Sequence, residues 1–153
     1  MKRAFFYLVF WVAVVAGAFS AFQTGMLPLW LNDFALIFSC ILMGILGGCL
    51  YCLRGIYLNA CVKGTWDNHW LPWYFIRPIV SGISGGVSWL FLKAGLLVLD
   101  AEQGAGASDI GFLALAFIAG LNVDKFISKI EQVAQATWGI EQSGVNSGRE
   151  KNK

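Results

Sequence analysis

The distribution of Lys and Arg residues constrains this chain more than any other feature. Four apolar blocks divide the sequence, and ten of the eleven Lys and Arg residues fall outside them or near their edges. These ten lie before the first block, between the second and third, and after the fourth: Lys2, Arg3, Arg54, Lys63, Arg77, Lys125, Lys129, Arg149, Lys151 and Lys153. The other two connections, 23–33 and 100–109, contain no Lys or Arg. Because cytoplasmic loops of membrane proteins are enriched in these residues, we expect a multi-pass membrane protein with both termini and the middle loop inside.

The composition agrees with this interpretation. The 153 residues are 58% hydrophobic and 13% charged, whereas soluble proteins have about 25% charged residues. The net charge of +2 is small and dispersed, which argues against nucleic acid as a partner. The lipid bilayer is the partner that the composition predicts.

The apolar blocks lie at about 4–27, 34–53, 73–99 and 110–123. The first three have the roughly 20 residues that a bilayer of about 30 Å requires. The fourth is short, so it either shares its inner end with the following segment, which we favour, or stops partway through the membrane. The predicted fold class is all-α: a polytopic domain of four transmembrane helices at 1–123, an amphipathic cytoplasmic helix at 124–139 and a disordered polar tail at 140–153.

The first block also resembles a signal peptide, since Lys2 and Arg3 precede it and small residues follow at Ala16 to Ala21. It is longer than the 7–15 residues of a typical signal core. We expect an uncleaved helix, because cleavage would leave three spans and place the new N-terminus outside.

Small residues recur at four-residue spacing on the second and third blocks. They are Gly44, Gly48, Ser81, Gly82, Gly85 and Gly86. In lipid, close backbone approach through small residues is a main source of helix association. The spacing predicts either packing of helices within one chain or an interface of a homo-oligomer, which would include a narrow pore.

Two basic residues lie inside or at the edge of the third block. Arg77 is either an anchor at the headgroups or the partner of Asp124, in which case the pair latches the C-terminal helix to the membrane domain. Pro78 after it is interpreted as the start signal of the helix. Lys93 lies near the outer surface, where it either extends to the headgroups or faces the axis of an oligomeric pore.

Acidic residues are concentrated in the two connections that lack Lys and Arg: Asp33, Asp100, Glu102 and Asp109. They could enrich cations at a pore mouth. A solvated loop is the alternative explanation, and it is the one that we favour.

The segment from Asp124 to Trp138 has the spacing of an amphipathic helix. Its apolar stripe is formed by Phe126, Ile130, Val133 and Trp138. Only Lys125 and Lys129 flank this stripe, which is a weak basic signature for binding anionic lipid. We therefore expect it to dock on protein: the extension of the second helix around Tyr57 and Val62, the same helix of a neighbouring copy, or a soluble partner.

The sequence carries few groups for catalysis. It has one His and no phosphate-binding loop, and its spans contain no paired carboxylates, so we expect neither an enzyme nor a cofactor. Four cysteines include a C-x-x-C pair: Cys40, Cys49, Cys52 and Cys61. Zinc sites usually need two such pairs on turns, so we interpret these as small buried thiols and expect no metal site.

The segments from Trp73 to Leu97 and from Ala116 to Phe126, with W-Y-x-x-R-P-x-x-S-G and A-F-I-A-G-L-N-V-D-K-F, resemble a group of small bacterial inner-membrane proteins. The similarity covers about residues 44–141. It implies a bacterial origin and four spans, and it supplies no catalytic residue. Some small membrane proteins of this kind accompany phage-defence genes, which is an analogy only.

Two functions remain open from the sequence. The one that the sequence favours is a homo-oligomeric pore, channel or membrane-perturbing component. The alternative is a non-enzymatic scaffold or sensor subunit that binds a soluble cytoplasmic partner.

Overall fold

The protein is all-α within the residues that its computed structural model describes, which are 2–23, 34–64, 68–95 and 105–139. The elements are α1 (Lys2–Gln23), α2 (Ala35–Tyr57), a π-helical turn η2 (Leu58–Val62), a 3₁₀ turn η3 (Asn68–Trp70), α3 (Leu71–Lys93), α4 (Ala105–Leu121) and α5 (Val123–Trp138). The predicted disordered tail lies outside the described residues.

Three helical segments are long and apolar enough to cross a membrane: α1, α2 with η2, and α3. The pair α4 and α5 is a fourth candidate, with a bend of 112° between its two helices. The chain is therefore a small multi-span membrane protein with three spans, or up to four.

The interpretation of Pro78 as the start of the third helix is wrong. Helix α3 begins earlier, at Leu71, with Pro72 in its first turn and Pro78 inside the helix. Pro72 lies where the backbone N–H would lack a helical partner in any case. Pro78 removes one helical hydrogen bond, and its side chain is fully buried, so packing offsets that loss.

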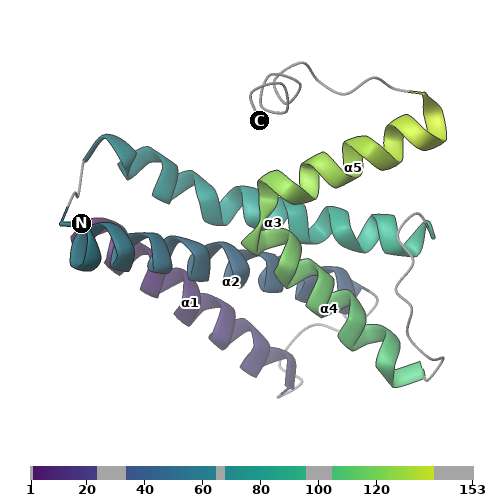
Figure 1. Cartoon of the computed structure of the whole chain (residues 1–153). Coiled ribbons are helices and arrows are strands. Elements are labelled where there is room, and N and C mark those ends of the chain that lie inside the picture. The colour runs from purple at the N-terminus through teal and green to yellow at the C-terminus, as the bar shows by residue number, and fades with distance from the viewer. Residues whose placement is uncertain (1, 24–33, 65–67, 96–104, 140–153) are drawn as a thin grey trace.

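Helix α2 is central and packs against α1, α3 and α4 (Figure 1). The backbones approach most closely at glycines: a Cβ atom added to Gly44 would collide with Ser81 O and lie 3.0 Å from the Cα atom of Gly85. A Cβ atom on Gly120 of α4 would collide with the backbone of Gly44. Three helices thus meet at Gly44, Gly85 and Gly120, which we call the glycine contact.

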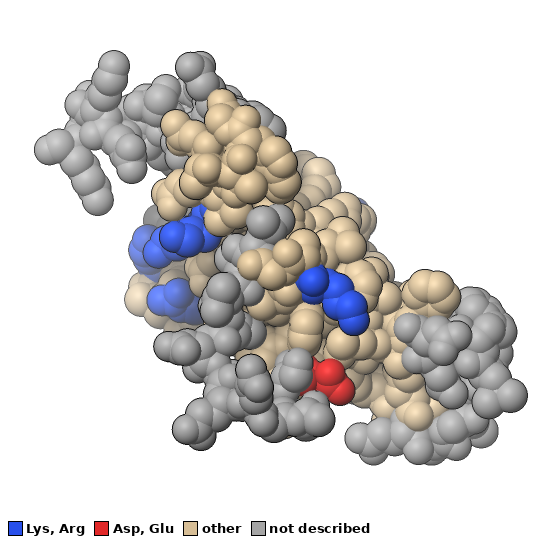
Figure 2. All heavy atoms as spheres, turned by 90° about the vertical axis from the view of Figure 1, so that its right-hand side faces the viewer, with Lys and Arg blue, Asp and Glu red and all other residues tan. Residues whose placement is uncertain are grey.

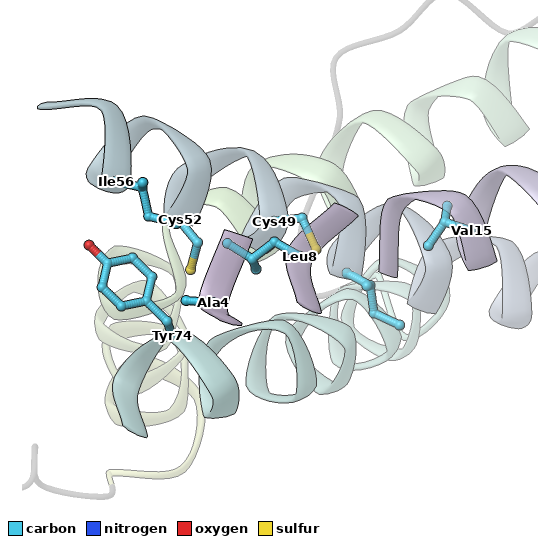
Figure 3. Packing of buried hydrophobic residues seen from close by; sticks show 8 residues of the cluster. Ala4, Leu8, Val15, Cys49, Cys52, Ile56 and Tyr74 are labelled. Atoms are coloured by element: carbon cyan, nitrogen blue, oxygen red, sulfur yellow. The ribbon is translucent and has the colours of Figure 1, made fainter. Parts of the chain in front are cut away.

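A separate apolar cluster joins α1 to α2 and α3, as Figure 3 shows. Its buried members are Ala4, Leu8, Val15, Ile45, Cys49, Cys52, Ile56 and Tyr74. The cysteines in this cluster act as small apolar side chains that fill space between helices.

Large apolar side chains cover much of the outer surface of the helices. On α1 and α3 the exposed ones include Phe6, Phe10, Ile79 and Ile83. Because lipid tails are as apolar as these side chains, such a surface suits direct contact with the hydrocarbon of a bilayer.

The bend between α4 and α5 lies at Asn122. Its φ of −125° and ψ of 57° are not helical, so the helix stops there. The Asn122 N–H closes α4 by donating to Ile118 O at 3.0 Å, and Asn122 O accepts the first hydrogen bond of α5 from Phe126 at 2.9 Å. One residue therefore ends one helix and starts the next.

At the far end of α5, Gly139 adopts a φ of 68° and its N–H donates to Gln135 O. A residue in this left-handed conformation is a common end of a helix.

The bend of 112° exceeds a right angle by 22°, so α5 partly reverses the direction of α4, as Figure 1 shows. If α4 is tilted from the membrane normal by 22° or more, α5 can lie in the plane of the membrane. Lys125, Lys129 and Glu131 on α5 are costly to place in hydrocarbon. These charges favour a broken span that ends at the surface over a hairpin that re-enters the core.

Adding one methyl group at the glycine contact should destabilise the protein. We expect Gly120→Ala to lower the free energy of unfolding by about 1–3 kcal/mol, because the new Cβ would overlap the Gly44 backbone. Gly17→Ala is the control, since nothing lies within 4 Å of its added Cβ. Unfolding in mixed micelles measures both, and equal stability of the two variants would contradict the packing.

The side of the membrane reached by α5 can be tested with an impermeant thiol reagent. Single cysteines at Thr137 and Asp109, both exposed, should be labelled from opposite sides, with Thr137 on the side of the native exposed Cys61. If the reagent labels Thr137→Cys from the same side of the membrane as Asp109→Cys, α4 and α5 instead form a re-entrant hairpin.

Candidate functional site

The main polar site surrounds Arg77, where α3, α4 and α5 meet. The Arg77 side chain is only 6% exposed, although it is charged. Its Nη1 atom lies 3.5 Å from Asp124 Oδ2 on α5, and its Nη2 atom lies 3.5 Å from Leu121 O at the end of α4. A guanidinium group from one helix therefore spans the bend between two others.

Both distances are long for hydrogen bonds, so attraction of charge contributes more than bond geometry. The carbonyl groups of the last turn of a helix lack helical partners and carry the negative end of the helix dipole. A cation beside Leu121 O offsets both. Asp124, in the first turn of α5, lies at the positive end of its own helix, where a carboxylate is also favoured.

Two aromatic rings contact the guanidinium group. The Arg77 Cζ atom lies 4.8 Å from the ring centroid of Tyr51 and 5.3 Å from that of Trp73. The two rings lie 5.8 Å apart. Cation–π contacts of this kind are worth about 2 kcal/mol or more when desolvated, and they offset part of the cost of burying the charge.

The site is not fully paired. Arg77 Nε is buried and has no hydrogen-bond partner among the described residues, while Asp124 is 84% exposed. One long ion pair, one carbonyl group and two rings hold the Arg77 guanidinium group, and together they join α3 to both sides of the bend. The arrangement can therefore act as a latch that sets the angle of α5.

A hydrogen bond close to this latch ties α3 to α4. Ser81 Oγ donates to Gly120 O at 2.9 Å, and a Cβ atom on Gly48 would collide with the Ser81 side chain. The other two buried serines of α3 bond within their own helix, Ser84 to Val80 O and Ser88 to Gly85 O. The serines thus satisfy their hydroxyl groups without water.

The structure places all six small residues of the sequence analysis on contacts inside one chain. Gly44 and Gly48 face Ser81 and Gly85, Gly82 faces Ile45, and Gly86 faces Ile41. Of the two alternatives, the geometry favours packing within the chain. Five of the six residues are buried, and Gly86 is half-buried.

Lys93 is exposed at the end of α3, where a cation complements the helix dipole. Its Nζ atom lies 6.0 Å from the Trp89 ring centroid. Figure 2 shows the molecule from this end. The basic side chains lie at separate places in this view, and tan atoms separate them from the acidic side chain. Of the four acidic residues expected here, only Asp109 is described, and it is exposed.

The four cysteines do not gather with other ligands. Cys40, Cys49 and Cys52 are buried and Cys61 is exposed. Among the described residues no group of three or more His, Cys, Asp or Glu side chains could hold a metal ion. His69 is exposed in η3, beside the ring of Trp70.

The apolar stripe of α5 does not dock where the sequence analysis placed it within the chain. Helix α5 packs against α3 and α4, while Tyr57 and Val62 are each 60% exposed. The bend at Asn122 directs α5 away from that end of α2 (Figure 1). Phe126, Ile130 and Val133 are half-buried and Trp138 is 59% exposed. Docking on a neighbouring copy or a soluble partner stays a prediction.

The aromatic contacts of Arg77 and the contact of Gly47 with α4 were not predicted from the sequence. Tyr51 lies in the second apolar block and Trp73 in an aromatic-rich segment, so neither stands out as a partner of Arg77. Gly47 was also missed: its added Cβ would collide with Phe117 O and lie 2.8 Å from Leu121 N. Its position next to Gly48 is the signal that α2 needs a second close contact.

Removing the guanidinium group should cost more than removing its carboxylate partner. We expect Arg77→Gln to lower the free energy of unfolding by about 2 kcal/mol, because the cap of α4 and the ring contacts are lost together. Asp124→Asn should cost less than about 1 kcal/mol, since Asp124 is 84% exposed and water screens its attraction to Arg77. Arg77→Lys, which keeps the charge without the planar fork, should fall between them. Equal losses in Arg77→Gln and Asp124→Asn would contradict this division.

Comparison of the chain with protein-family models, with curated proteins and with solved structures gave no match.

Proposed function

We propose that this protein is a non-enzymatic adaptor of the bacterial inner membrane, with both termini in the cytoplasm, whose membrane domain holds α5 at the inner surface for a soluble partner. The observation that carries the proposal is the bent junction between α4 and α5, bridged by Arg77 through Leu121 O and Asp124. A buried charge at a helix junction is costly unless it is compensated. A role in holding α5 at one angle to the membrane domain explains why the charge of Arg77 is buried at this junction.

The faces of α5 suit a docking role. Lys125, Lys129, Gln132 and Gln135 are exposed on its polar side. Its apolar stripe is half-buried near the bend and ends in the exposed Trp138. Trp is enriched at the energetic centres of protein interfaces, so the free end of α5 is the part that we expect a partner to contact.

A homo-oligomeric pore or membrane-perturbing component is the competing function, and the geometry gives it less support. The glycines that suggested an oligomer are used within one chain. The side chains that α3 leaves exposed are large and apolar, Ile76, Ile79 and Ile83 among them, and such a surface does not suit the wall of a water-filled pore.

Crosslinking from defined positions in living cells tests the proposal. A photoreactive residue at Gln132 or Trp138 should give a discrete adduct with another protein, and Arg77→Gln should reduce its yield severalfold because α5 is no longer held at one angle. The same residue at Ile83, exposed on α3, is the control and should not give this adduct.

The purified chain in liposomes provides the second measurement. An adaptor should leave the vesicles impermeable to monovalent cations. Conductance that depends on protein concentration, together with adducts at Gln132 that contain only this chain, would reject the adaptor and support the homo-oligomeric pore.

A further inference from the structure

A half-open groove lies between the start of α1 and the end of α2, away from the Arg77 latch. Its volume is about 760 Å³ and its lining is almost wholly apolar. The lining residues are Phe5, Phe6, Leu53, Ile56, Tyr57, Ala60 and Cys61. The volume is within the roughly 300–1,000 Å³ of small-molecule sites.

The π-helical turn shapes this groove. Tyr57 precedes η2, and Ala60 and Cys61 lie within it, so the helix changes its pitch at the groove. Single π-helical turns are rare and are frequent at functional sites. Ala60 contributes only a methyl group to the lining, and the lining residues Phe6 and Tyr57 are 68% and 60% exposed.

The groove crosses the expected edge of the hydrocarbon. From Ala35 to Arg54 the helix rises about 28 Å, which is close to the bilayer thickness of about 30 Å. Leu53 therefore lies at hydrocarbon depth, while Ala60 and Cys61 lie at the level of the headgroups. An occupant must be apolar at one end and tolerate water at the other.

Two exposed arginines lie close in sequence to lining residues of the groove. Arg54 is one turn before Tyr57 on α2, and Arg3 is one turn before Phe6 on α1. Within the described part of the chain, neither arginine has an ion pair, and no acidic residue lies in the first turn of α1. Arginine favours phosphate, which its planar fork can bind through two parallel hydrogen bonds.

We propose that this groove binds a phospholipid with an anionic headgroup, with its acyl chain along Phe6, Leu53 and Ile56 and its phosphate facing Arg3 and Arg54. The acyl chain gains little by leaving other lipid tails for an apolar groove. Selection among lipids therefore comes from the headgroup charge, which is the property that the arginines recognise.

Native mass spectrometry of the full chain tests this after extraction from nanodiscs of equal phosphatidylglycerol and phosphatidylcholine. The wild-type chain should retain phosphatidylglycerol in preference. Arg3→Gln and Arg54→Gln should each reduce that preference about fivefold. Ala60→Trp should abolish retention of either lipid by filling the hollow.

Two variants serve as matched controls. Lys93→Gln removes an exposed cation at the C-terminal end of α3, and Ile83→Trp adds an indole ring to an exposed position on α3. Both should retain lipid as the wild-type chain does. Equal retention of the two lipids by the wild-type chain, or the same loss in Lys93→Gln as in Arg54→Gln, would overturn the proposal.

The exposed Cys61 provides a separate check on the occupant. If a second copy filled the groove, oxidation in native membranes would join Cys61 of one chain to that of another. A high yield of this disulfide that added phosphatidylglycerol does not reduce would show that the groove is an interface between copies, and the lipid assignment would be wrong.

Discussion

The fold depends on the close approach of three helix backbones at Gly44, Gly85 and Gly120. In a bilayer, apolar side chains gain little by moving from lipid to protein, so helices associate through tight packing and polar contacts. The absence of side chains at these three positions permits that packing. The Ser81 hydroxyl group then donates across the contact to Gly120 O. This directional bond orients α3 and α4 relative to each other, which packing alone would not do.

The same contact determines where the polar site lies. Because α4 contacts Gly44 and Gly47 of α2 near its C-terminal end, through Phe117, Gly120 and Leu121, its unpaired carbonyl groups end beside α3. Arg77 lies one turn before Ser81 on α3 and so meets that end. The ion pair with Asp124 and the rings of Tyr51 and Trp73 follow from this placement. The angle of α5 is thus linked to the packing of the membrane domain, and this link is the physical basis of the proposed adaptor function.

The sequence was sufficient for the all-α class and for the positions of most helices, because apolar runs and the Lys and Arg pattern are local signals. The pairing of Arg77 with Asp124 was one of two alternatives, since both residues lie next to the inner ends of apolar blocks. The contacts of Arg77 with Tyr51 and Trp73 could not be predicted, because they depend on how helices rotate against one another. The role of Pro78 and the docking site of α5 were predicted wrongly. Pro78 is buried inside a longer helix, and the geometry at Asn122 directs α5 toward α3 and α4.

The central claim, that Arg77 holds α5 at one angle to the membrane domain, is tested most directly by the distance between α5 and α3. Spin labels at Gln132 and Ile83, both exposed, can be measured by double electron–electron resonance in nanodiscs. We expect one narrow distance distribution for the otherwise unchanged chain and a much broader one when Arg77→Gln is added. A broad distribution without that substitution, or a narrow one that Arg77→Gln leaves unchanged, would contradict it.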